Sequence, residues 1–158
     1  MLPVEIDFCS PADVDAVWAV EEASFWPPWP RAVIERDLAG ESDYLYLCAR
    51  AGGRALGFAV LQKRGLWAEL ANIAVLPLYR KRGVASQLLA AAGEIASEIG
   101  CRAMSLRVRV SNTGAAALYR LFGFSPAGRE REYYADGEDA FIMEARLPLR
   151  LPGEGEQS

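Results

Sequence analysis

The chain has 158 residues and a formal net charge of −4, with 52% hydrophobic and 24% charged residues. This length and composition fit one folded globular domain and argue against general disorder. The acidic balance argues against nucleic-acid binding through a basic surface. No apolar run approaches the roughly 18 residues that span a bilayer, so we expect no membrane partner and a cytoplasmic location.

The chain contains no histidine, which removes Ser-His-Asp and Cys-His nucleophilic sites and the commonest metal ligand. A general base must then be a carboxylate, Tyr, Lys, Cys or water. Cys9, Cys48 and Cys101 lie far apart and form no CxxC pair. The spacing therefore predicts neither a disulfide framework nor a metal site, and we expect buried free thiols.

The first half of the chain predicts a strand, two helices and three strands. Ser10 as N-cap and Pro11 at the first helical position mark the first helix. Gly52-Gly53 between two apolar, β-prone runs indicates a hairpin. The expected ranges are 4–8, 11–24, 31–40, 44–51, 55–63 and 67–75.

The second half predicts a long amphipathic helix after Gly83, a strand, a short helix capped by Asn112, and a final hairpin. The expected ranges are 84–99, 104–110, 113–122, 125–134 and 140–147. The order is βααβββαβαββ, an α/β (α+β) pattern whose central strand–helix–strand crossover makes strands 67–75 and 104–110 parallel. One domain over residues 1–150 and a flexible tail over residues 151–158 follow from this reading.

A basic turn stands between the strand 67–75 and the long helix. Between Glu69 and Glu94 the charged residues are Arg80, Lys81 and Arg82 alone. A helix N-terminus offers free backbone N–H groups and the positive end of the helix dipole. Gly83 and the small Ala85 let the backbone approach a ligand closely. The pattern RxxGxA predicts an anion site, whereas GxxxxGK and GxGxxG are absent.

The segment from Phe25 to Pro30, FWPPWP, holds large aromatic side chains in a stiff loop because proline forbids regular structure there. Two interpretations stay open for Phe25 and Trp29. They pack the first two helices onto the sheet, or form a wall of a substrate groove, where a rigid loop loses little entropy on binding, or do both.

Three stretches together resemble the GNAT acetyltransferase superfamily, and within it the RimI-type enzymes that acetylate protein N-termini. They are NIAVLPLYRKRGVASQLL, LRVRVSNTGAAALYRLFGF and REREYYADGEDAFIM. The resemblance covers nearly all of the chain. It implies a GNAT fold, in which helices cover both faces of a mixed sheet and the fourth and fifth strands splay, and it implies acetyl-CoA as cosubstrate without a metal.

The resemblance also assigns roles. The pyrophosphate of acetyl-CoA would contact the RxxGxA segment, and its pantetheine arm would pair with the strand before it. The implied cofactor-binding residues are Ile73, Ala74, Val75, Arg80, Lys81, Arg82, Gly83, Val84, Ala85, Ser86 and Asn112. Tyr119 would stand near the thioester sulfur as general acid, and a tyrosine, with an ordinary pKa of about 10, is protonated at neutral pH as that role requires.

The base is where this chain departs from its relatives. RimI-type enzymes carry a catalytic glutamate in a pattern like LEVRASN, whereas LRVRVSN puts Arg107 at that position, and arginine cannot act as a base. Glu69 is the natural substitute. A competing interpretation is a Glu69–Arg107 ion pair, which would make Glu69 a poorer base.

Tyr133 and Tyr134 resemble the paired tyrosines that hold the substrate backbone in N-terminal acetyltransferases, and Phe25, Trp29 and Arg107 complete the expected substrate-binding set. We predict direct acetyl transfer to a primary amine, in first place the N-terminal α-amine of a protein or peptide, with a ribosomal protein among the candidates. A small amine is the alternative acceptor, and a catalytically silent CoA-binding module is the rival. A monomer or weak dimer is expected.

Overall fold

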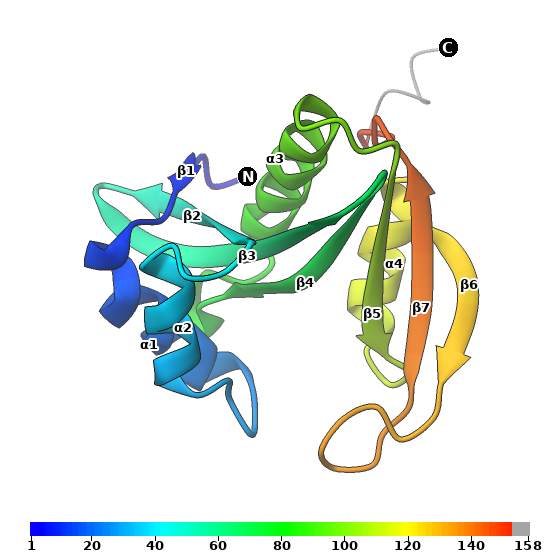
Figure 1. Cartoon of the computed structure of the whole chain (residues 1–158), viewed down its shortest axis with the longest axis horizontal. Coiled ribbons are helices and arrows are strands. Elements are labelled where there is room, and N and C mark those ends of the chain that lie inside the picture. Colours follow the sequence, from blue (N-terminus) through cyan, green and yellow to red (C-terminus); the bar gives the residue numbers. More distant parts are fainter. Residues whose placement is uncertain (153–158) are drawn as a thin grey trace. The chain divides into compact units, whose positions relative to one another are not determined.

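The computed structural model describes residues 1–152, so residues 153–158 of the predicted tail lie outside the described residues. Seven strands form one mixed sheet in the order β1-β2-β3-β4-β5-β7-β6 (Figure 1). The elements are β1 (Glu5–Phe8), α1 (Val14–Ser24), α2 (Arg31–Leu38), β2 (Tyr44–Ala51), β3 (Arg54–Arg64), β4 (Trp67–Val75), α3 (Val84–Glu98), β5 (Ala103–Arg109), α4 (Thr113–Leu121), β6 (Ser125–Glu130) and β7 (Ala140–Arg146). This order confirms the predicted α/β pattern.

Contacts within the chain group into two compact units. The first comprises residues 1–62 and 71–92, and the second comprises residues 63–70 and the chain from Gly93 onward. The division falls inside β3, inside β4 and inside α3. The single domain expected over residues 1–150 stays a prediction.

The first helix begins as the sequence predicts. The backbone N–H of Ser10 donates to Asp13 Oδ2 at 2.8 Å, and Pro11 opens a short 3₁₀ turn, Pro11–Asp13, that leads into α1. Such a cap satisfies donors that a helix leaves free at its N-terminus. Gly40, with φ of 81°, follows α2 and provides the left-handed residue that often ends a helix.

In the first unit, β2 and β3 send alternate side chains to opposite faces of the sheet, as the period of a strand requires. The α1 and α2 helices lie side by side (Figure 1, blue) and supply one core. Its buried members are Val17, Val20, Ile34, Leu38, Tyr46, Cys48, Phe58, Val60 and Ala74. On the other face α3 packs at Gly57, where an added Cβ would lie 3.3 Å from Leu88 Cδ1 and 2.6 Å from the Ala74 carbonyl oxygen. Only glycine fits there.

In the second unit, β5 pairs antiparallel with β7, and β7 pairs antiparallel with β6. A parallel ladder joins the first residues of β4 to the first residues of β5, from Trp67–Ala103 to Leu70–Leu106. Along β5 the buried side chains Met104, Leu106 and Val108 alternate with partly buried ones that face the other way. The predicted parallel pairing of these two strands is confirmed.

The final hairpin differs from the prediction at its tip. The strand expected over residues 125–134 ends at Glu130 instead. Glu132 adopts a positive φ of 50°, which interrupts an extended strand, and its backbone N–H donates to Asp139 Oδ1 at 2.9 Å. Tyr133 and Tyr134 therefore lie in a loop that spans residues 131–139.

Over residues 1–152, we find no helix with the length and apolar character needed to cross a membrane.

Candidate active site

The predicted basic turn lies between the end of β4 and α3. After a 3₁₀ turn, Pro77–Tyr79, the backbone passes through positive φ at Lys81 (63°) and Gly83 (81°) before α3 begins at Val84. The side chains of Arg80, Lys81 and Arg82 are exposed, and within residues 1–152 no carboxylate pairs with any of them. Three unneutralised cations beside a helix N-terminus form a site suited to phosphate groups.

Arg80 also ties the turn to its own unit. Its Nε donates to the Val75 carbonyl oxygen at 3.0 Å, and its Nη2 donates to Ser24 Oγ at 3.3 Å. A guanidinium has five N–H donors, so these two bonds leave donors for a ligand. The turn is thus held at a defined place against the last residues of β4 and α1.

Residues 1–4 pack against the same turn, which the sequence did not indicate. The Leu2 N–H donates to the Arg82 carbonyl oxygen at 2.8 Å. Gln87 holds the segment from α3, since its Nε2 donates to the Leu2 carbonyl oxygen at 2.7 Å and its Oε1 accepts from the Val4 N–H at 3.1 Å. An added Cβ at Gly83 would lie only 2.8 Å from Met1 Cγ, so a side chain at Gly83 would displace the Met1 side chain.

Glu21 is a buried carboxylate in α1 that sequence reasoning missed. It is 1% exposed and accepts two hydrogen bonds of 2.8 Å, from the Trp29 backbone N–H and from Asn72 Nδ2. Burial raises the pKa of the Glu21 carboxyl, and the two hydrogen bonds oppose that shift. One signal was available, because Glu21 lies four residues after Val17 and so on the apolar face of the helix.

Glu21 positions the aromatic loop and β4 at once. Asn72 immediately precedes Ile73, the first of the expected cofactor-binding residues on β4, and Trp29 closes the loop that follows α1. A single carboxylate therefore fixes both the loop backbone and the side chain before Ile73. Replacing it would leave two partly buried donors without this partner.

The aromatic loop divides its side chains between core and surface. Trp29 packs against the core of the first unit, as the packing interpretation predicts. Phe25 is 37% exposed and Trp26 is 86% exposed. Trp26, which was not among the expected substrate-binding residues, presents the largest exposed apolar surface of this loop.

Glu69 lies on the same sheet face as Arg107 because it pairs with Ser105, two residues before Arg107. Arg107 Nη1 lies 3.7 Å from Glu69 Oε1, and Arg64 Nη2 lies 3.3 Å from Glu69 Oε2. The ion pair considered from the sequence is therefore present. Arg107 makes its shorter bonds to Glu130, at 3.1 and 3.2 Å, and this two-point pairing is the stronger one.

Tyr133 and Tyr134 each lie against an arginine of β5. The Arg107 guanidinium carbon is 5.2 Å from the Tyr133 ring centroid, and that of Arg109 is 4.1 Å from the Tyr134 centroid. The two tyrosine rings meet edge to face at 5.0 Å. Burial raises the pKa of Tyr134 to about 12, so the phenol stays protonated, while Tyr133 is 46% exposed. Cation–π contacts of this kind hold both rings in place.

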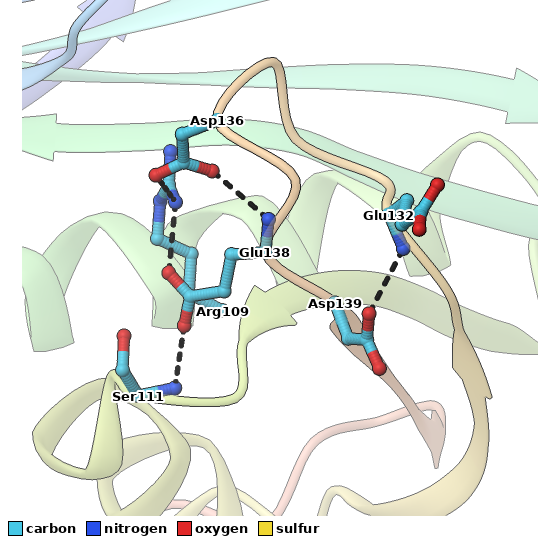
Figure 2. Close-up of polar contacts among 6 residues, drawn as sticks. All are labelled: Arg109, Ser111, Glu132, Asp136, Glu138 and Asp139. Carbon is cyan, nitrogen blue, oxygen red and sulfur yellow. Dashed lines mark hydrogen bonds and ion pairs between the residues drawn. The ribbon is translucent and has the colours of Figure 1, made fainter.

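Arg109 also organises the loop of residues 131–139 through carboxylates (Figure 2). Its Nη1 donates to Asp136 Oδ2 at 2.9 Å and to Glu138 Oε1 at 2.8 Å. The other oxygen of Glu138 accepts from the Ser111 N–H at 2.8 Å. Hydrogen bonding to Ser111 and Arg109 lowers the pKa of the Glu138 carboxyl. Arg109 and Glu138 were not among the expected site residues, although Arg109 shares the alternation that places Arg107 on this face.

Tyr119 and Asn112 lie on α4 and at its start. Tyr119 is 6% exposed and meets Phe124 edge to face at 5.8 Å, and burial raises the pKa of its phenol. It is a core aromatic in the second unit and stays protonated at neutral pH, as a general acid must. Asn112 caps α4 as predicted, since its Oδ1 accepts from the Ala115 N–H at 3.1 Å. The roles expected of these two residues toward acetyl-CoA stay predictions.

Comparison with known proteins identifies the family. Residues 14–124 match the Acetyltransferase (GNAT) family. The [ribosomal protein bS18]-alanine N-acetyltransferase of Salmonella typhimurium is 36% identical over 92% of this chain and 98% of its own length. The N-alpha-acetyltransferase RimI of Mycobacterium tuberculosis is 34% identical over 89% and 91%.

The crystal structure of the ribosomal-protein-S18-alanine N-acetyltransferase from Escherichia coli covers 99% of this chain and 99% of its own, with a TM-score of 0.82 and 30% sequence identity. These similarities indicate the same family as the order of elements and the turn at the start of α3. The chain belongs to the GNAT acetyltransferase family.

Proposed function

We propose that this protein transfers the acetyl group of acetyl-CoA to the N-terminal α-amine of a protein, with a ribosomal protein as the first candidate acceptor. The observation that carries this proposal is similarity over nearly the whole chain to enzymes named for acetylating the alanine of ribosomal protein bS18. In the reaction the amine nitrogen attacks the thioester carbonyl, a C–N bond forms, and the C–S bond breaks. The amine loses one proton, and the departing CoA thiolate takes one up.

The first unit supplies the groups for the cofactor. Arg80, Lys81 and Arg82 carry exposed positive charge without carboxylate partners among residues 1–152, and the first N–H groups of α3 add to it. Together they fit the phosphates of acetyl-CoA. Backbone groups of residues 73–75 take the pantetheine arm, and a preorganised N–H there stabilises the oxyanion of the tetrahedral intermediate.

The second unit supplies the groups that move protons. Glu69 takes the proton of the incoming amine through a water molecule. Arg107 makes its shorter bonds to Glu130 and approaches Glu69 only to 3.7 Å, while Arg64 pairs with the other Glu69 oxygen at 3.3 Å. Tyr119 donates the proton that the CoA thiolate needs. Tyr133 and Tyr134, held by Arg107 and Arg109, bind the backbone of the acceptor peptide.

An acetyl-transfer assay tests this function. The full chain is incubated with acetyl-CoA and with peptides that differ in their first residue, including the N-terminal sequence of ribosomal protein bS18. We expect a mass increase of one acetyl group at the α-amine, and none on the same peptide with a blocked N-terminus. Transfer to free amines alone would support the small-molecule alternative. Binding of acetyl-CoA without turnover on any acceptor would support the CoA-binding module.

A further inference from the structure

Two thiols that are far apart in the sequence meet in the first unit. Cys9 follows β1 directly, and its N–H donates to the Tyr46 carbonyl oxygen at 2.9 Å. Cys48 lies two residues beyond Tyr46 on β2, and side chains at this spacing share one sheet face. The two Sγ atoms are 2.6 Å apart. A disulfide bond is about 2.05 Å long, so a bond between these atoms needs only a small side-chain movement.

The surroundings make the two thiols unequal. Cys48 is fully buried, whereas Cys9 is partly exposed. Their mutual hydrogen bond raises the pKa of the Cys9 thiol and lowers the pKa of the Cys48 thiol. Burial works against the Cys48 thiolate and the Arg50 guanidinium works for it. Arg50 is held nearby by Asp13, at 2.8 Å, and by Asp7, at 3.1 Å. Because Cys9 is partly exposed, its thiol is accessible to small reagents, and the buried Cys48 thiol lies next to it.

A metal site is the competing interpretation, because a carboxylate oxygen of Asp13 and the two sulfur atoms all lie within 4.8 Å of one another. Two thiolates on tetrahedral zinc are about 3.7 Å apart, since Zn–S bonds are about 2.3 Å long. The observed 2.6 Å is nearer to the length of a disulfide bond than to that separation. Asp13 is also engaged already, because it accepts from the Ser10 N–H and pairs with Arg50. Bond formation between the sulfurs fits this site better than a metal does.

We propose that Cys9 and Cys48 are a reversible redox site at which a hydroperoxide oxidises the pair to a disulfide. Cys9 loses its proton to solvent and attacks the outer peroxide oxygen as a thiolate. The O–O bond breaks, the leaving oxygen takes up a proton, and Cys9 becomes a sulfenic acid. Cys48 then attacks the Cys9 sulfur, the S–S bond forms, and the hydroxyl group leaves with the Cys48 proton as water. Two thiols lose two electrons, and the peroxide accepts them.

The bridge would fasten a short edge strand. β1 has four residues and pairs only with β2 in the described chain, and such terminal strands open easily. Residues 1–4, which precede β1, hold the backbone of Arg82 and the side chain of Gln87. A covalent link at Cys9 would therefore secure the segment that packs on the basic turn.

Peptide mapping of the wild-type full chain tests the proposal directly. The reduced protein is treated with one equivalent of hydrogen peroxide, the remaining thiols are alkylated, and the digest is analysed without reduction. We expect a linked peptide that contains Cys9 and Cys48, with Cys101 alkylated. A dithiol reagent should remove the link. Alkylation of all three cysteines after peroxide treatment, or a sulfinic acid at Cys9 without a link, would overturn the proposal.

Thermal unfolding provides the second measurement. We expect oxidation to raise the melting temperature by roughly 5–10 °C, because a cross-link restricts the unfolded chain. Cys101→Ser should keep this response, and Cys9→Ser and Cys48→Ser should lose it. An equal response in Cys9→Ser would contradict the proposal even if the variants differ in stability. Stoichiometric zinc binding by the reduced wild-type protein that protects both Cys9 and Cys48 from alkylation would replace the redox site by a metal site.

Discussion

The molecule carries two groups of basic side chains that differ in their partners. Arg80, Lys81 and Arg82, at the start of α3, face solvent without a carboxylate partner among residues 1–152. Arg107 and Arg109, on β5, are each paired with carboxylates and each lie against a tyrosine ring. The difference separates two uses of positive charge. Cations without a carboxylate partner are suited to bind an external anion. Cations that are paired within the chain hold its own carboxylates and tyrosine rings in place.

Charge reversal at the basic turn should have the largest effect. We expect Arg80→Glu/Lys81→Glu to weaken acetyl-CoA binding by about 100-fold, because each change removes a charge-assisted hydrogen bond and adds repulsion. Isothermal titration with acetyl-CoA measures this. The matched control is Arg102→Glu/Arg146→Glu, which makes the same change in net charge at two other exposed positions. Equal losses in the two double variants would mean that the turn acts only through overall charge.

Replacement of the two residues proposed to transfer protons should come next. We expect Glu69→Gln and Tyr119→Phe each to lower the acetyl-transfer rate at least about tenfold, a typical loss for removal of a general base or acid. Acetyl-CoA affinity should stay unchanged in both variants. Single-turnover kinetics at saturating acetyl-CoA measure the rate.

Arg107→Gln is the informative partner variant for this test, since it removes the Arg107–Glu69 ion pair and keeps the Glu69 carboxylate and its pair with Arg64. If Glu69 is the base, Arg107→Gln retains far more activity than Glu69→Gln. Wild-type turnover in Glu69→Gln would show that Glu69 is not the base and that it only forms ion pairs with Arg107 and Arg64.

Loss of a paired arginine should affect peptide binding more than chemistry. In Arg109→Gln the Glu138 and Asp136 carboxylates lose their cation, and Tyr134 loses the guanidinium that lies against its ring. We expect KM for the peptide to rise about fivefold, as a cation–π contact and hydrogen bonds to charge would suggest, while kcat and acetyl-CoA affinity change little. Arg129→Gln, which removes a pair with Asp139 and a contact with the Phe141 ring, is the control. A weakened acetyl-CoA affinity in Arg109→Gln would contradict the proposal that the two basic groups have separate roles.

Local signals in the sequence were sufficient to predict the basic turn at the start of α3. They were insufficient to predict the carboxylate partners of the arginines on β5. The basic turn is a continuous segment, so the residues that form it are adjacent in the chain. The same holds for the capping box at Ser10 and for the strand Tyr44–Ala51, whose predicted bounds are confirmed. These features depend on neighbours a few residues apart.

The carboxylate partners of Arg109 come instead from strand register and from a loop conformation. The hairpin tip was mispredicted because a positive φ at Glu132 has no reliable sequence signal. Glu21 bonds to Asn72, and Cys9 meets Cys48, across long intervals of chain. Such pairings are products of the assembled fold, so a pattern of spacing cannot reveal them.

Acid titration should show the smallest difference between the two groups. The pKa of Glu138 is lowered by hydrogen bonds from Ser111 and Arg109, and that of Asp139 by hydrogen bonds from Glu132 and Arg129. A carboxyl group whose pKa is lowered by folding stabilises the folded state above its unfolded pKa, and this contribution is lost as the pH falls through the folded value. We therefore expect the loop of residues 131–139 to loosen below about pH 4.5, the ordinary range for a glutamate.

Melting temperatures between pH 6 and pH 3 measure this loss. Glu21 contributes with the opposite sign, because its pKa is raised by burial, so the informative quantity is the difference between wild type and Arg109→Gln. That difference should shrink as the pH falls, since protonated Glu138 no longer needs the guanidinium. The basic turn has no carboxylate to titrate, and the difference between wild type and Arg80→Gln, which adds no carboxylate, should stay flat over the same range. A flat difference for Arg109→Gln as well would show that its carboxylate pairs add nothing to the stability of the loop.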